Sequence, residues 1–168
     1  IVAAQIYAGD AADSVTLVPS VRKAEAHLER VATAAVVEEV VADKGYHAAA
    51  ALAECAAWGL RTYIPERRER GPRRWTDKAI GWESAFRANR RRTRGRRSRA
   101  LQRRRSERVE RSFAHTCGSG HQRRTWLRGV ENVQKRYCLT TAARNLGLLM
   151  RHCFGIGTPR SLQGRLAA

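Results

Sequence analysis

The sequence places an acid at the end of an apolar run. Residues 36–42 read VVEEVVA, and the run stops at Asp43, which is followed by Lys44 and Gly45. A strand that presents a carboxylate at its carboxyl end is a common way to build an active site on an α/β sheet. Asp and Gly are also turn formers, so the same residues could simply end a strand. The pattern therefore predicts an acid at a sheet edge, with an ordinary turn as the alternative.

The second chemical feature is a large excess of positive charge. The 168 residues include 33 Lys and Arg against 15 Asp and Glu, a net charge of +18 and a pI near 11.4. Residues 66–111 hold 19 of the basic and 6 of the acidic side chains, so most of the excess lies there. Such a concentration of charge is typical of surfaces that bind nucleic-acid phosphates. The alternative is a solvated helical insertion with no bound anion.

We predict phosphate contacts from the arginines of this basic run, which are Arg90, Arg91, Arg92, Arg94, Arg96, Arg97, Arg103, Arg104 and Arg105. Arginine runs contact the nucleic-acid backbone without reading bases, so we expect little sequence recognition from them.

Cysteine and histidine positions favour neither disulfides nor zinc. The four cysteines show no C-x-x-C spacing and are expected to be free thiols in a reducing cytoplasm. His115, Cys117 and His121 are close in sequence, but their spacing matches no closed four-ligand zinc pattern. No apolar run approaches the roughly 20 residues of a membrane span, which predicts a soluble protein.

Hydrophobic periodicity predicts an alternation of strands and helices in the first 66 residues. Strands are expected at 1–9, 36–43 and 60–66, and helices at about 19–33 and 47–58. This β-α-β-α-β order implies right-handed crossovers and a mostly parallel sheet.

The remainder is predicted to be helical. A helix is expected over about 83–114, interrupted near Gly95, and a long amphipathic helix over 123–151, or two helices broken near Gly129. Residues 154–168 show no pattern and are expected to be disordered.

Four segments in this order carry a resemblance to a known family. ADKGYH (42–47), YIPE (63–66), VERSFAH (109–115) and the stretch 123–151 resemble the catalytic domain of bacterial insertion-sequence transposases of the DDE type. The resemblance implies an α/β, RNase H-like fold, with a mixed sheet flanked by helices, over residues 1–153. The arginine-rich helical insertion would occupy about 67–105. The family's first acid sits on a strand that would precede Ile1, so the domain is expected to be incomplete at its N-terminus.

The resemblance also implies a catalytic site. Asp43 corresponds to the family's second acid and Glu110 to its third, with Glu107 as the alternative for the helix-borne acid. These acids would hold Mg²⁺ or Mn²⁺, two ions in the complete site, which clamp the attacking and leaving oxygens of a DNA phosphodiester. Lys44 and Arg111 flank the acids and would contact phosphates.

The implied activity is metal-dependent DNA cleavage and strand transfer at element ends. The partner would be DNA, bound by a homodimer at the bacterial nucleoid in the cytoplasm. With one of three acids missing, we expect this chain to be inactive, or nearly so, by itself. The alternative is a non-catalytic basic protein that binds nucleic acid through the arginine-rich segment, in which Asp43 and Glu110 have no common role.

Overall fold

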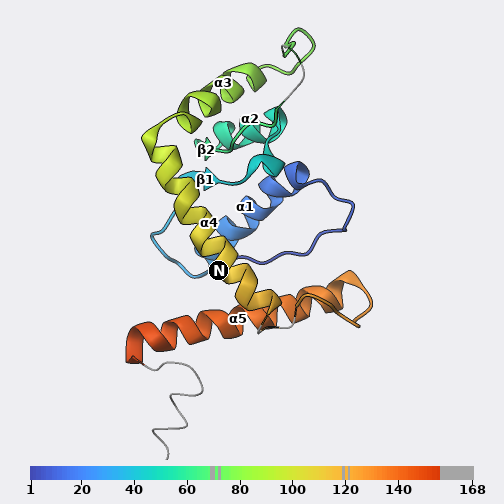
Figure 1. Cartoon of the computed structure of the whole chain (residues 1–168), viewed down its shortest axis with the longest axis vertical. Coiled ribbons are helices and arrows are strands. Elements are labelled where there is room, and N and C mark those ends of the chain that lie inside the picture. Colours follow the sequence, from blue (N-terminus) through green and yellow to red (C-terminus); the bar gives the residue numbers. More distant parts are fainter. Residues whose placement is uncertain (69–70, 72, 119, 121, 156–168) are drawn as a thin grey trace, which may run out of the picture. The chain divides into compact units, whose positions relative to one another are not determined.

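The computed structural model describes residues 1–68, 71, 73–118, 120 and 122–155 of the chain (Figure 1). The chain divides into two compact units. One comprises residues 7–111 with Val2, and the other comprises residues from 112 onward with Ile1 and residues 3–6. The described residues form a mixed α/β structure with five α-helices and one small parallel sheet.

The sheet is a β-α-β unit. β1 (Glu39–Val41) pairs in parallel with β2 (Arg61–Tyr63), and Val40 lies opposite Thr62. α2 (Ala49–Ala57) connects them, and Gly59, two residues after its end, has a φ of 74° that suits a left-handed turn. The parallel pairing predicted for these two segments is confirmed, although each strand is only three residues long.

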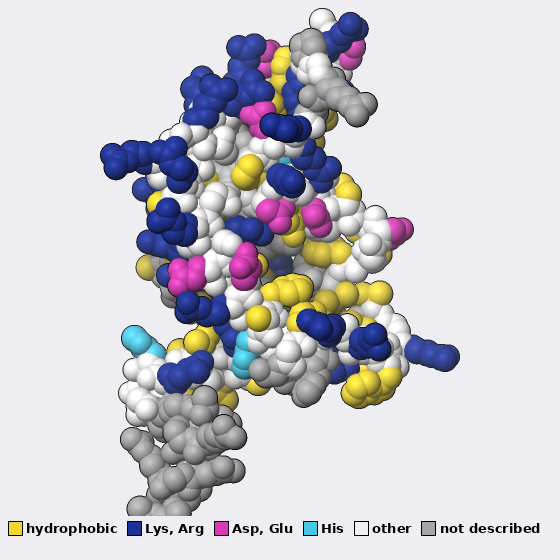
Figure 2. Space-filling view, in the orientation of Figure 1, with side chains coloured by type: hydrophobic (Ala, Val, Ile, Leu, Met, Phe, Trp, Pro, Cys, Tyr) yellow, Lys and Arg dark blue, Asp and Glu magenta, His cyan; other side chains and the backbone are white. Residues whose placement is uncertain are grey.

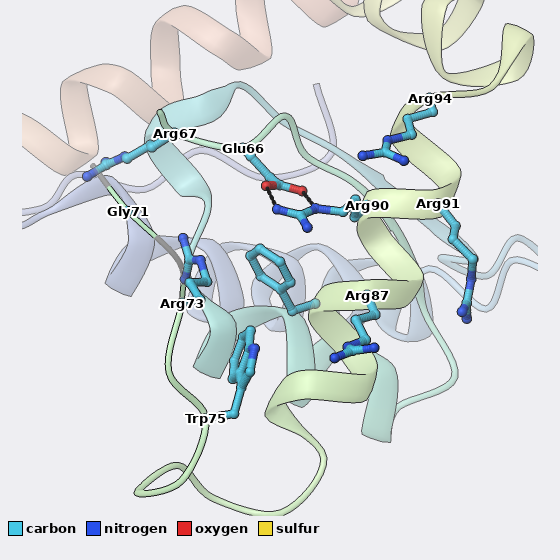
Figure 3. Close-up of a pocket in the computed structure, with 10 residues that line it drawn as sticks. Glu66, Arg67, Gly71, Arg73, Trp75, Arg87, Arg90, Arg91 and Arg94 are labelled. Carbon is cyan, nitrogen blue, oxygen red and sulfur yellow. Dashed lines mark hydrogen bonds and ion pairs between the residues drawn. The ribbon is translucent and has the colours of Figure 1, made fainter. Parts of the chain in front are cut away.

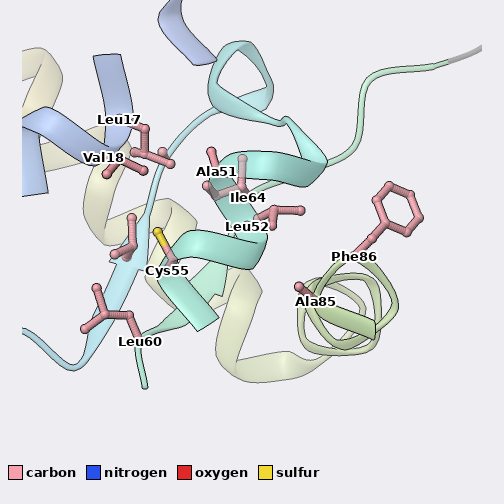
Figure 4. Close-up of a cluster of buried hydrophobic side chains, with 11 residues drawn as sticks. Leu17, Val18, Ala51, Leu52, Cys55, Leu60, Ile64, Ala85 and Phe86 are labelled. Carbon is pink, nitrogen blue, oxygen red and sulfur yellow. The ribbon is translucent and has the colours of Figure 1, made fainter. Parts of the chain in front are cut away.

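The core of this unit lies between α2, the sheet and two further helices (Figure 4). α1 (Asp13–Arg30) contributes Leu17, and α3 (Trp82–Thr93) contributes Phe86. Leu52 of α2 and Ile64, just after β2, are almost completely buried. Burying each such side chain stabilises the fold by about 1.5–3 kcal/mol.

A buried amide joins α3 to the end of β2. Asn89 is fully buried, and its side chain accepts a hydrogen bond from Ile64 N (3.1 Å) and donates one to Ile64 O (2.8 Å). The amide thereby does what a neighbouring strand would do for this backbone. α3 stops before Gly95, and α4 (Arg96–Cys117) follows it, so the predicted break near Gly95 is confirmed.

The second unit is built on α5 (Val130–Phe154), which starts directly after Gly129 (φ 85°). The predicted strand at residues 1–9 is wrong, because no strand forms there. Instead, side-chain amides of α5 bond this backbone: Gln134 accepts from Ile6 N at 2.6 Å and donates to Ala4 O at 2.9 Å. The side chain of Gln134 therefore bonds two backbone groups, Ile6 N and Ala4 O, that a neighbouring strand could have paired.

Three other expectations concern the start of α1, the size of the sheet and the C-terminal tail. α1 starts at Asp13, earlier than the predicted 19, and it contains Pro19 within its length. The coarse prediction of an α/β fold is confirmed, but the described sheet has only two strands. The disordered tail was predicted to begin at 154, but Phe154 is the last residue of α5, and residues 156–168 lie outside the described residues.

Candidate nucleic-acid interface

The turn after β1 brings two carboxylates to one glycine. Asp43 caps the short 3-10 helix η1 (Lys44–Tyr46), and its Oδ1 accepts a hydrogen bond from Gly45 N at 2.8 Å. A Cβ added at Gly45 would lie 2.5 Å from Asp13 Oδ2 and 2.9 Å from Asp43 Oδ1. A larger residue at this position would therefore require both carboxylates to shift.

Asp13 is the residue of this turn that the sequence analysis missed. It is the first residue of α1. Burial raises the pKa of the Tyr46 hydroxyl, and the charges of Asp13 and Asp43 raise it further. No spacing in the sequence signals this contact, because it depends on how α1 packs against η1.

α4 crosses the carboxyl ends of both strands. Gln102 donates hydrogen bonds to Ala42 O at 3.0 Å and to Tyr63 O at 2.7 Å. One turn further along, Arg105 Nη2 lies 3.1 Å from Asp43 Oδ2. Asp43 therefore stands at the strand end, as predicted, but its charge is paired with an arginine of α4.

The two acids of α4 have partners on α4 itself. Glu110 accepts a hydrogen bond from Ser106 Oγ, and Glu107 forms an ion pair with Arg111 at 2.9 Å. Both glutamates are exposed. Within the described part of the chain, no three His, Cys, Asp or Glu side chains gather into a group that could hold a metal ion. This arrangement does not fit the two-ion site that the resemblance implies, since such a site needs several converging carboxylates.

The eleven predicted phosphate-contacting residues fall into three groups. Four are ion-paired, namely Arg90 with Glu66, Arg97 with Glu39, Arg105 with Asp43 and Arg111 with Glu107. The exposed ones, which have no ion-pair partner among the described residues, are Lys44, Arg91, Arg94, Arg96, Arg103 and Arg104. Their charge is the part of the predicted set that is not neutralised by a neighbouring carboxylate.

Arg92 alone forms the third group, because the fold itself uses its side chain. It is half-buried and donates hydrogen bonds to Thr62 O (2.9 Å) and Thr62 Oγ1 (3.1 Å). Burial lowers the pKa of its guanidinium. Arg92 therefore ties α3 to β2 in this structure.

Basic side chains are concentrated over α3 and the first turns of α4. Figure 2 shows Lys and Arg crowded on this part of the surface, with few acidic side chains among them. Arg99, which was not among the predicted contacts, is also exposed there and has no ion-pair partner in the described part of the chain. We name Arg91, Arg94, Arg96, Arg99, Arg103 and Arg104 the exposed α3–α4 arginines.

A pocket of about 640 Å³ opens beside this surface (Figure 3). Its lining consists of Glu66, Arg67, Gly71, Arg73, Trp75, Phe86, Arg87, Arg90, Arg91 and Arg94. A shallower hollow of about 430 Å³ continues past Arg94 to Arg99 on α4. The concave part of the interface therefore lies between α3 and the segment that follows β2.

Sequence reasoning missed part of this pocket. Four of its lining residues were not named as contacts, namely Arg67, Arg73, Trp75 and Arg87. On α3 the signal was present: Arg87, Arg90, Arg91 and Arg94 are spaced by three and four residues and lie on one helical face. The loop arginines carry no such spacing.

Comparison of the chain with protein-family models, curated proteins and solved structures found no match. Among the described helices, none is long and apolar enough to cross a membrane.

Proposed function

We propose that this chain is part of a DDE-type transposase catalytic domain that binds the DNA backbone and does not cut DNA by itself. The observation that carries the proposal is the set of six exposed α3–α4 arginines. None of them has an ion-pair partner among the described residues, so their charge is free to meet phosphates. The assignment to a transposase rests in addition on the family resemblance.

Electrostatics support DNA as the partner. A protein that neutralises phosphates releases the counterions condensed on DNA, and this release supplies most of non-specific affinity. The structure offers arginines on two consecutive helices and a net charge of +18. Binding to DNA would place the protein at the bacterial nucleoid in the cytoplasm, and a homodimer on DNA belongs to the same proposal.

The geometry supports binding without cleavage. Asp43 is paired with Arg105, and Glu110 is bonded to Ser106 on its own helix. Mg²⁺ or Mn²⁺ binding is therefore proposed only for a domain to which another acid is added. In that domain Arg105 would have to release Asp43.

Fluorescence anisotropy with a labelled duplex of random sequence tests the binding proposal. We expect the triple variant Arg96→Glu/Arg99→Glu/Arg103→Glu to bind at least 10-fold more weakly than the parent at low salt. The slope of log K against log salt should also become less steep, because each lost phosphate contact contributes about 0.9 to it. Circular dichroism checks that the helices remain.

Lys23→Glu/Arg30→Glu on α1 is the control. Both side chains are exposed and have no ion pair in the described structure, and they lie outside the α3–α4 surface. The control should lose affinity only through the change in net charge. Equal losses per charge in the two variants would contradict a specific role for α3 and α4.

A basic nucleic-acid-binding protein without a transposase origin is the second candidate. The Asp43–Arg105 ion pair favours it, since a paired acid needs no catalytic partner. Both candidates predict that the chain does not cut DNA, and a nicking assay with Mn²⁺ tests this shared expectation. We expect no cleavage by the chain, and turnover that disappears in Glu110→Gln would contradict the proposal that it only binds.

A further inference from the structure

The arginine pocket differs from the rest of the basic surface because it is concave and partly aromatic. Phe86, which is only 2% exposed, lies against Trp75 with the ring centroids 5.1 Å apart. The guanidinium of Arg73 lies 4.4 Å from the centre of the Phe86 ring, and that of Arg90 lies 5.0 Å from it. Stacking on an aromatic ring holds a guanidinium in place while leaving its N–H groups able to donate.

Other contacts fix the remaining walls. Glu66 accepts two hydrogen bonds of 2.6 Å from Arg90, and this bidentate geometry fixes the two side chains relative to each other. Arg67 donates to Lys44 O at 3.1 Å and to Gly45 O, which ties the start of the pocket to the turn after Asp43. In Figure 3, Arg94 points toward the Glu66–Arg90 pair and Arg87 points toward Trp75. Arg67, Arg73 and Arg90 are therefore positioned before any ligand arrives.

The charges of the pocket are not balanced. Among its lining residues only Glu66 is acidic, and it is already paired with Arg90. Arg87 is paired with Glu83 from the same helix. Arg67, Arg91 and Arg94 have no carboxylate partner in the described structure. In Figure 3, Arg94 points into the pocket, whereas Arg67 and Arg91 extend away toward opposite sides of the view. The lining therefore carries more positive than negative charge, and a group with two negative charges would offset part of this excess.

We propose that this pocket binds a nucleotide phosphomonoester, either the 5′-phosphate end of a DNA strand or a free nucleoside monophosphate. A phosphomonoester carries about −1.5 to −2 charges at pH 7, whereas an internal phosphodiester carries one. The cavity volume lies in the range of small-molecule sites, roughly 300–1,000 Å³, and suits one nucleotide. Trp75, which is partly exposed, supplies a ring beside the arginines for the nucleoside.

The inference rests on the proposed function and adds a ligand class to it. Internal phosphates would bind along the exposed α3–α4 arginines, and a strand end would enter the pocket. The proposal therefore predicts a preference for phosphorylated ends on top of general backbone affinity.

Binding of two matched oligonucleotides tests it. Single-stranded 20-mers with a 3′ fluorophore are compared, one with a 5′-phosphate and one with a 5′-hydroxyl. We expect the parent protein to bind the phosphorylated strand at least 5-fold more tightly at moderate salt. Arg91→Glu/Arg94→Glu should remove this preference, whereas Lys23→Glu/Arg30→Glu should keep the ratio.

Competition distinguishes the two sources of the phosphomonoester. If thymidine monophosphate abolishes the preference at the same concentration at which the phosphorylated strand does, the pocket is a site for free nucleotides. Competition only by the strand assigns it to DNA ends. Thymidine without phosphate should not compete in either case.

Failure of the pocket assignment and failure of the proposed function give different outcomes in this experiment. Equal binding of both strands by the parent protein overturns the pocket assignment but leaves backbone binding intact. A preference that survives in Arg91→Glu/Arg94→Glu also overturns it. Failure of the hydroxyl strand and the duplex to bind even at low salt instead overturns the proposed function.

Discussion

Arg105 Nη2 lies 3.1 Å from Asp43 Oδ2, so the acid that follows β1 is neutralised by a cation carried on α4. Sequence analysis assigned these two residues to different roles, Asp43 to a metal site and Arg105 to DNA phosphates. The structure instead joins them to each other. This contact is why the chain is proposed to bind DNA without cutting it.

Removal of this arginine is expected to expose Asp43 to cations. Arg105→Ala should lower the free energy of unfolding by no more than about 1 kcal/mol, because a partly exposed ion pair is worth little. Mn²⁺ affinity, measured by calorimetry, should rise from undetectable to weak. Arg104→Ala, which removes an exposed arginine without an ion pair in the described structure, is the control and should change neither quantity. Strong Mn²⁺ binding by the parent chain would contradict this account of the turn.

Gly45 is expected to be required by its two neighbouring carboxylates. Gly45→Ala places a Cβ within 3 Å of both Asp13 and Asp43, so the side chains must shift. We expect a loss of about 1–3 kcal/mol in urea unfolding, the usual cost of overpacking. Gly9→Ala is the matched control, because nothing lies within 4 Å of the added Cβ.

A double variant tests the cause of that loss. Asp13→Ala removes the closer of the two carboxylates, so it should recover part of the stability lost in Gly45→Ala. Additive effects of the two substitutions would show that Asp13 does not press on this turn.

Asn89 is expected to be among the most sensitive polar positions. Asn89→Ala leaves Ile64 N and O without their buried partner, and each unsatisfied group costs about 1–3 kcal/mol. We expect a total loss of about 2–4 kcal/mol in urea unfolding. Asn132→Ala, at an exposed amide of α5, should cost less than about 0.5 kcal/mol. Similar values for the two variants would argue against the strand-like role of Asn89.

The Glu66–Arg90 pair is expected to make stability depend on pH. The hydrogen bond from Arg90 lowers the pKa of Glu66 below 4.5, so the folded state favours the carboxylate. The unfolded state therefore takes up the proton first as pH falls. The contribution to stability is present above pH 4.5 and is lost as pH falls through the folded pKa.

Comparison of the parent chain with Glu66→Gln checks this dependence. The stability difference between them, from urea unfolding, should be largest near pH 6 and should shrink below pH 4.5. A constant difference from pH 7 to pH 3 would contradict the assigned role of the pair.

Local pattern was sufficient for several elements of the fold. The β-branched run before Asp43 predicted a strand, and Gly95 within the helix expected over 83–114 predicted a break there. The parallel pairing followed from the length of the crossover between the strands, because a chain that must return to the same end needs a connecting helix. These features depend on residues close in sequence, so periodicity and turn chemistry determine them.

The conformation of residues 1–9 and the ion-pair partner of Asp43 could not be predicted in the same way. Residues 1–7 have a strand-like composition, but the backbone at Ala4 and Ile6 bonds to Gln134, which lies far away in the chain. The ion-pair partner of Asp43 likewise comes from α4, and Asp13 of α1 lies near the same turn. A contact between residues far apart in the chain produces no local sequence pattern from which it could be predicted.

The sequence by itself determined the net charge of this protein, its run of arginines and the acid that follows β1. Only the tertiary structure decided which of these charges remain available. It paired Asp43 with Arg105 and Glu66 with Arg90, and it left Arg91 and Arg94 at the wall of a pocket. The physical reason is that ion pairing acts over a few ångströms in space, and the fold sets which charges come that close.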